Sequence, residues 1–123
     1  MAKILIAEDD SSMRNFLCLS LKKAGHEVIT ADDGLIALNI IEKQNTDPGD
    51  LDLLLTDIVM PGMDGIELSQ KATKHNPEIK IMFITGFAAV SMEKSQPEKN
   101  TKLLSKPFHL KDLVNEVNSL LAA

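Results

Sequence analysis

The residue with the strongest claim to chemistry is Asp57, which closely follows the apolar run Leu51–Leu55. A short apolar run bounded by turn residues is typical of a strand that is buried on both faces. Pro61 and Gly62 then predict a turn before the next helix. A carboxylate at the carboxyl end of a central parallel strand lies in the crevice where open α/β sheets bind their ligands. We therefore expect Asp57 to carry the chemistry of this chain.

Polar residues follow the other predicted strands as well. Glu8 and Asp9 come after the first apolar run, Thr85 after the fourth and Lys106 after the fifth. Because the carboxyl ends of parallel strands share one edge of a sheet, these side chains are expected to converge on Asp57.

Such a cluster predicts phosphoryl chemistry with a divalent cation. Clustered carboxylates repel one another unless a cation neutralises them. Oxygen ligands without cysteine or histidine favour Mg²⁺, which binds a few carboxylates together with phosphate. A carboxylate beside Mg²⁺ can attack a phosphoryl group and form an aspartyl phosphate. The metal and Lys106 would neutralise charge on the phosphoryl oxygens, and the Thr85 hydroxyl would donate to one of them.

Each of these residues also has an ordinary explanation. A single acid at a strand end is more often solvated or caps the following helix, and Asp10 and Asp64 are predicted to be caps. Only the joint placement of the set, in order at the ends of apolar runs, favours a site. The histidines His26, His75 and His109 lack ligand spacing and are expected to be solvated.

Strands and helices are predicted to alternate along the chain, which indicates an α/β fold with a parallel sheet and helices on both faces. The second helix, opening near Asp33, is expected to turn Leu35, Leu38 and Ile41 toward the core. The segment before the fifth strand breaks the pattern, because Pro97 leaves room only for a short helix over about 88–94. The predicted strands are 3–7, 26–31, 51–55, 79–84 and 103–104.

The length, charge and composition of the chain argue against several classes of protein. The 123 residues are enough for one domain with a proper core, and the net charge of −5 with a single arginine argues against a nucleic-acid partner. The lone Cys18 cannot form an internal disulfide. No apolar stretch reaches the roughly 18 residues of a membrane span, and no signal peptide is evident. A cytoplasmic protein without a membrane partner is expected.

Four motifs in this order resemble the receiver domain of two-component response regulators. They are EDD at 8–10, TDIVMPGMDG at 56–65, ITG at 84–86 and SKPF at 105–108. The resemblance implies a flavodoxin-like (CheY-like) doubly wound fold. Its five parallel strands would have the order 2-1-3-4-5, with five flanking helices and the fourth short or irregular. It covers residues 1–123 and implies a receiver domain with no output domain.

The resemblance also implies residue roles. Asp57 would accept phosphate from a histidine kinase or a histidine phosphotransfer protein, Thr85 would be the switch hydroxyl, and Lys106 would pair with the phosphate. Mg²⁺ would be held by Asp9, Asp57 and the Val59 carbonyl, with Glu8 acting through water.

A narrower resemblance is to single-domain regulators of alphaproteobacteria, carried by KIMFITGFAAV at 80–90 and by the C-terminal helix. It implies an adaptor for the Clp unfoldase–protease that acts in the unphosphorylated state, in cell-cycle control. The chain departs from typical receivers at Leu103, where many carry an aromatic switch residue. Phe87, Val90, Met92 and Leu103 are therefore either an apolar partner surface or filling beneath a short helix.

The tail and the function class leave alternatives open. Ala122 and Ala123 resemble the tags that Clp-type unfoldases engage, or they are the fraying end of a helix. A stand-alone receiver of the chemotaxis or phosphate-shuttle type is the second function considered. A phosphohydrolase is disfavoured because Val59 stands where a second acid would be needed. A transcription factor is disfavoured because no basic segment follows the receiver.

Overall fold

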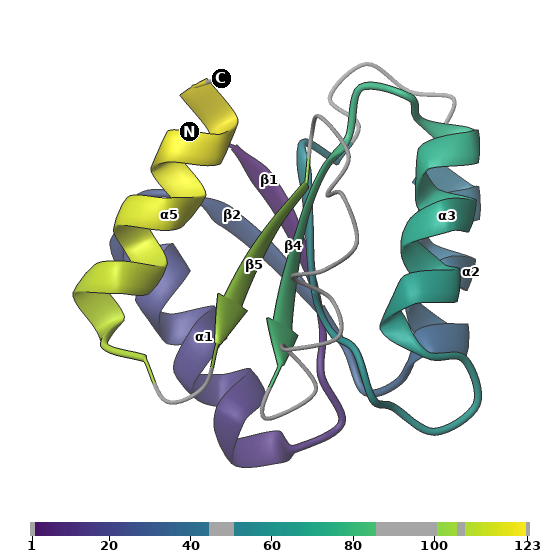
Figure 1. The fold of residues 1–123 in the computed structure, drawn as a ribbon, viewed down its shortest axis with the longest axis horizontal. Coiled ribbons are helices and arrows are strands. Elements are labelled where there is room, and N and C mark those ends of the chain that lie inside the picture. The colour runs from purple at the N-terminus through teal and green to yellow at the C-terminus, as the bar shows by residue number, and fades with distance from the viewer. Residues whose placement is uncertain (1, 45–50, 86–100, 106–107, 123) are drawn as a thin grey trace.

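A computed structural model describes residues 2–44, 51–85, 101–105 and 108–122. Five strands form one parallel sheet in the order β2-β1-β3-β4-β5, as predicted (Figure 1). The strands are β1 (Lys3–Ala7), β2 (Glu27–Ala31), β3 (Leu53–Asp57), β4 (Lys80–Thr85) and β5 (Thr101–Ser105). The described helices are α1 (Ser11–Lys23), α2 (Gly34–Gln44), α3 (Gly65–His75) and α5 (Leu110–Ala122). The short helix expected over 88–94 lies outside the described residues.

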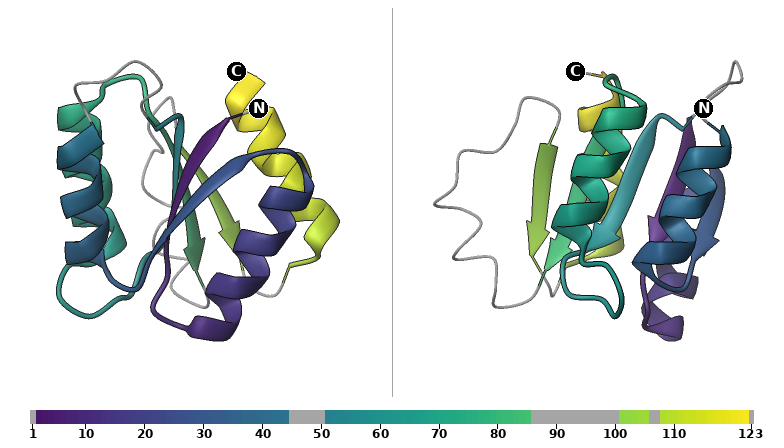
Figure 2. Two further views of the ribbon diagram at one scale, coloured as in Figure 1. Left: turned by 180° about the vertical axis from the view of Figure 1, so that it is seen from behind. Right: turned by 90° about the vertical axis from the view of Figure 1, so that its right-hand side faces the viewer.

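The helices cover both faces of the sheet, with α1 and α5 on one side and α2 and α3 on the other (Figures 1 and 2). The central strands β1 and β3 are apolar at nearly every position because both of their faces are covered. Leu5 and Leu54 pack toward α2 and α3, while Ile6 and Leu55 pack toward α1 and α5. All four side chains are 0% exposed, so the centre of the sheet is a rigid support for the groups at its ends.

Aspartates fix the starts of the helices at the carboxyl edge of the sheet. The Asp10 carboxylate accepts from the Ser12 amide at 2.9 Å, and the Asp64 carboxylate accepts from the Glu67 amide at 2.8 Å. The Asp33 carboxylate accepts from the Ile36 amide in the first turn of α2, also at 2.9 Å. These bonds satisfy amides that the helix itself leaves open. The predicted capping roles of Asp10 and Asp64 are confirmed.

The prediction for the buried face of α2 is wrong at Leu35, which is 56% exposed. The helix buries Ile41 as predicted, together with Gly34 and Ala37, and Leu38 is partly buried against the core. Gly34 packs so closely against the backbone of Met63 that an added Cβ would overlap the Met63 carbonyl oxygen. This contact sets the rotation of the helix, and the position next to Gly34 then faces outward. No helix in the described ranges is both long and apolar enough to span a membrane.

Candidate phosphoacceptor and cation site

Three carboxylates meet at the carboxyl edge of the sheet. Glu8 and Asp9 follow β1, Asp57 is the last residue of β3, and β1 and β3 are parallel neighbours. One carboxylate oxygen of each of the three lies within 4.8 Å of the others. Glu8 is only 1% exposed, Asp57 is half-buried, and Asp9 is exposed. The sequence-predicted convergence of these three residues is therefore present in the structure.

The loop that carries Glu8 and Asp9 is held by hydrogen bonds on both sides. The Glu8 amide donates to the Ala31 carbonyl at 3.1 Å and so continues the pairing of β1 with β2. The Glu8 carboxylate accepts from the Asp10 amide at 3.2 Å. The Glu8 carbonyl accepts from the guanidinium of Arg14 at 2.9 Å. Glu8 is thus fixed through its backbone and its side chain.

The backbone of Asp57 is held by its neighbours in sequence and in space. The Thr56 hydroxyl donates to the Asp57 carbonyl at 2.9 Å. The first residue of α3, Gly65, packs against the same carbonyl, and an added Cβ at Gly65 would overlap the Asp57 oxygen. The Gly65 amide also donates to the Ile58 carbonyl at 2.8 Å. Glycine at position 65 therefore allows α3 to begin directly against the strand end that carries Asp57.

This acidic cluster fits a hard divalent cation. Its donors are all carboxylate oxygens, which suit Mg²⁺ or Ca²⁺ better than softer metals. Three carboxylates whose oxygens lie within 4.8 Å of one another repel when ionised, unless a cation neutralises them. Figure 1 shows that the loops after β1 and β3 leave the same edge of the sheet. The cluster can therefore bind a cation and present Asp57 beside it.

The structure gives less information on the other three predicted site residues, Thr85, Lys106 and Val59. Thr85 is the last residue of β4, one position beyond the Ile84 that pairs with Asp57, so its backbone reaches the same edge. Lys106 lies outside the described residues, directly after Ser105 at the end of β5. Val59 follows β3 by two residues, and its side chain is 72% exposed. The structure brings together the three acids and leaves the predicted roles of the other three residues as predictions.

The predicted partner surface falls mainly outside the described residues, which do not include Phe87, Val90 or Met92. Leu103 is described, and it is partly buried against the core on the α2 and α3 side. In the predicted tag, α5 continues through Ala122, which is exposed, and Ala123 is not described.

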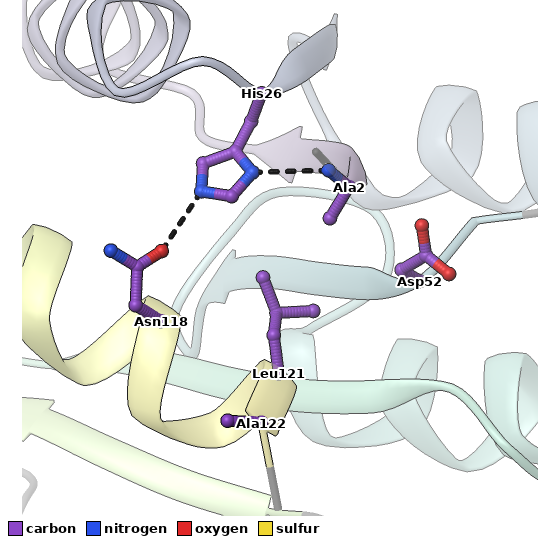
Figure 3. A pocket seen from close by; sticks show the side chains of 6 residues that line it. All are labelled: Ala2, His26, Asp52, Asn118, Leu121 and Ala122. Carbon is purple, nitrogen blue, oxygen red and sulfur yellow. Dashed lines mark hydrogen bonds between the residues drawn. The ribbon is translucent and has the colours of Figure 1, made fainter.

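An open cleft of about 380 Å³ lies at the opposite, amino edge of the sheet (Figure 3). His26 lines this cleft, and its ring is hydrogen-bonded on both nitrogens. It accepts from the Ala2 amide at Nδ1 (3.2 Å) and donates through Nε2 to Asn118 Oδ1 (3.0 Å). The expectation that His26 is merely solvated is therefore wrong. The cleft is lined by Ala2, His26, Asp52, Asn118, Leu121 and Ala122.

Sequence reasoning also missed the part played by Arg14, which it noted only as the single arginine. The guanidinium binds the loop of Glu8 and lies 3.6 Å from the Asp32 carboxylate. The only available signal was its spacing six residues after Glu8, and that spacing does not identify the partner.

Comparisons with known proteins agree with this geometry. Residues 4–118 match the response regulator receiver domain family. The chain is 52% identical to the response regulator receiver protein CpdR of Brucella abortus (strain 2308), covering 100% of this chain and 99% of that protein.

Two crystal structures have the same fold. The receiver domain of the hybrid histidine kinase CckA is 34% identical, with a TM-score of 0.80 over 97% of this chain and 98% of that one. A response regulator receiver protein from Sinorhizobium medicae WSM419 is 26% identical, with a TM-score of 0.88 over 99% and 95% of the two chains. The predicted receiver fold and the narrower resemblance, which is to CpdR, are confirmed.

Proposed function

The chain belongs to the response regulator receiver family, and from that premise we propose that Asp57 accepts a phosphoryl group with the help of Mg²⁺. A carboxylate oxygen of Asp57 attacks the phosphorus, and the bond from phosphorus to the donor's histidine nitrogen breaks. The product is an aspartyl phosphate. The observation that supports this proposal most strongly is the meeting of Glu8, Asp9 and Asp57 at one strand edge.

The chain's own residues would each have a task in this reaction. Asp9, Asp57 and the Val59 carbonyl would hold the cation, with Glu8 acting through a bound water. The cation, when bound, neutralises charge on the phosphoryl oxygens. The Thr85 hydroxyl would donate to one phosphoryl oxygen, and the Lys106 ammonium would pair with another. The movement of these two residues toward the phosphoryl group would then alter the neighbouring surface.

The first test is phosphorylation with a small phosphodonor, followed by intact-protein mass spectrometry. The wild type should gain one phosphoryl group per chain in Mg²⁺ and none in EDTA. Asp57→Asn should gain none. Asp52→Asn is the matched control, because Asp52 lies just before the other end of the same strand, and it should react like the wild type. Phosphorylation of Asp57→Asn would refute the assignment.

We propose a regulator and not an enzyme with turnover. The second residue after Asp57 is Val59, which has no group to donate or accept a proton. Sustained release of phosphate from a phosphomonoester, many equivalents per chain, would contradict this and favour a phosphohydrolase.

We further propose that the unphosphorylated form is a cytoplasmic adaptor for a Clp unfoldase in regulated proteolysis. Full-length similarity to CpdR supports this proposal, together with the sequence features of that group. The donor would be a histidine kinase or a histidine phosphotransfer protein. The resemblance to the receiver of the hybrid kinase CckA is compatible with a phosphorelay of that kind. A stand-alone receiver that acts on another partner is the second candidate, since the fold alone suits both.

Capture of the purified Clp unfoldase separates these two candidates. The Asp57→Ala form should bind the unfoldase, and the wild type in Mg²⁺ and beryllofluoride should not. Binding by neither form would leave the stand-alone receiver. Binding by the beryllofluoride form alone would reverse the direction of the switch.

Two variant sets test the expected contact regions. If Phe87, Val90, Met92 and Leu103 form the partner surface, then Phe87→Ala should weaken unfoldase binding and leave the urea midpoint unchanged. A fall in the midpoint would assign Phe87 to the core.

If the tail is a tag, replacing Ala122 and Ala123 with aspartate should lengthen the cellular half-life. An unchanged half-life would mean that it only ends a helix.

A further inference from the structure

Arg14, the chain's one arginine, joins two loops at the carboxyl edge of the sheet. It lies in α1, and its side chain is only 18% exposed. One guanidinium nitrogen, Nη1, donates to the Glu8 carbonyl at 2.9 Å. The Nε nitrogen lies 3.6 Å from Asp32 Oδ1, in the segment between β2 and α2. The Arg14 guanidinium therefore connects the loop of Glu8 and Asp9 to the loop that carries Asp32.

This contact completes the support of the Glu8–Asp10 segment. The Glu8 amide is bonded to Ala31, and Asp10 is fixed because its carboxylate caps α1. Asp9 lies between these two fixed residues, and its side chain is exposed. The direction of its carboxylate therefore depends on how firmly its two neighbours are held. The Arg14 guanidinium donates from α1 to the Glu8 carbonyl and so adds a side-chain support to this loop.

We propose that Arg14 is a positioning residue for the cation site: it holds the loop of Glu8 and Asp9 in the arrangement that binds a divalent cation. This inference rests on the proposed function, because it assumes that the three acids bind Mg²⁺. Loss of an outer contact that orients a metal ligand typically costs about 10- to 100-fold in metal affinity. Arg14 acts through Glu8 and does not itself touch the cation.

The planar fork, and not the charge alone, carries this role. The guanidinium presents donors in fixed directions, so it can reach the Glu8 carbonyl and the Asp32 carboxylate together. A lysine at position 14 would keep the positive charge near the acids but has a single ammonium group. Arg14→Lys therefore separates positioning from simple neutralisation of the cluster.

The experiment measures Mg²⁺ affinity by isothermal titration calorimetry in the wild type, Arg14→Lys, Arg14→Met and Asp32→Asn. Urea unfolding and amide hydrogen exchange of the metal-free proteins are recorded beside it. Both Arg14 variants should raise the Kd about tenfold. Exchange at the Asp10 and Ser12 amides should accelerate. Asp32→Asn should change the Kd less than threefold, because the exposed Asp32 contributes only a long ion pair.

The outcomes separate this inference from the proposed function. If the wild type binds Mg²⁺ and Arg14→Met binds equally well, the inference fails and the cation site stands. Wild-type affinity in Arg14→Lys would also overturn it, because charge alone would then suffice. If the wild type does not bind Mg²⁺, both fail together. Should Arg14→Met not fold, the decision rests on Arg14→Lys, whose charge is unchanged.

Discussion

The polar groups at the two edges of the sheet are arranged in opposite ways. At the amino edge the groups complement one another: the Asp52 carboxylate accepts from the Lys3 amide at 2.8 Å, and His26 bridges Ala2 and Asn118 (Figure 3). At the carboxyl edge three like charges are gathered within 4.8 Å. The same central strands run between the two edges. The amino edge therefore stabilises the fold, and the carboxyl edge gathers like charges that a bound cation would neutralise.

This difference indicates that the polar residues of the amino edge serve stability, whereas those of the carboxyl edge serve chemistry. A buried or half-buried acid such as Glu8 or Asp57 is unfavourable in a metal-free fold unless something else holds it in place. Here the Asp10 amide donates to the Glu8 carboxylate, while Gly65 and Arg14 fix the backbones of Asp57 and Glu8. Functional sites are commonly the places where a fold departs from its own stabilising pattern.

The largest expected effect comes from adding one methyl group at Gly65. In Gly65→Ala the Cβ would overlap the Asp57 carbonyl oxygen, and backbone must shift to make room. We expect a loss of about 3 kcal/mol in the free energy of unfolding, together with loss of phosphorylation. Urea unfolding followed by circular dichroism measures this, because the chain has no Trp or Tyr for fluorescence.

Gly25→Ala is the matched control at the end of α1. Gly25 has φ +98°, and an added Cβ would meet no atom of another element within 4 Å. The cost is then only that of the left-handed backbone, about 1 kcal/mol, and phosphorylation should be unchanged. Equal losses in the two variants would contradict the view that the contact with Asp57 is special.

A pair of acid substitutions, one at each edge, should have effects of opposite sign. Asp9→Asn removes a like charge and should stabilise the metal-free protein by about 1 kcal/mol. Asp52→Asn weakens the bond from the Lys3 amide and should destabilise it by about 1 kcal/mol. Urea unfolding of the metal-free proteins measures both. Destabilisation by Asp9→Asn would contradict the repulsion inferred at the carboxyl edge.

Added Mg²⁺ sharpens the same comparison. At a concentration one hundred times its Kd, the ion should stabilise the wild type and Asp52→Asn by about 2.7 kcal/mol. It should stabilise Asp9→Asn much less. Equal stabilisation of all three proteins would mean that the ion binds elsewhere.

A similarly small effect is expected at His26, at the amino edge. Removing the ring in His26→Ala breaks the bonds to Ala2 and Asn118, which are partly exposed, and should cost about 1 kcal/mol. Asn118→Ala in the His26→Ala background should cost little more, since the partner is already gone. Mg²⁺ affinity should not change in either variant. A weaker affinity would show that the two edges are coupled.

Much of the site could be predicted from the sequence because it depends on local patterns. Glu8, Asp9 and Asp57 each follow an apolar run, and the parallel order of strands then brings them to one edge. The capping by Asp10 and Asp64 depends on residues only two or three positions away. These features need only neighbours along the chain and the edge that parallel strands share.

The features that sequence reasoning missed depend on how distant elements dock. His26 and Asn118 are 92 positions apart, so no local pattern identifies the bond between them. The outward rotation of Leu35 follows from the contact of Gly34, the first residue of α2, with Met63 in the loop before α3. The partner of Arg14 is a backbone carbonyl, which every residue has. Such contacts become visible only in three dimensions.

The most direct test of the account is a nuclear magnetic resonance titration of backbone amides with Mg²⁺ and then beryllofluoride. The account predicts shifts concentrated at the carboxyl edge, around Glu8–Asp10, Asp57 and Thr85, and almost none around Ala2, His26 and Asn118. In Asp57→Asn the beryllofluoride step should be silent. Shifts centred on the amino edge, or an unchanged beryllofluoride response in Asp57→Asn, would contradict the assignment of the carboxyl edge as the site.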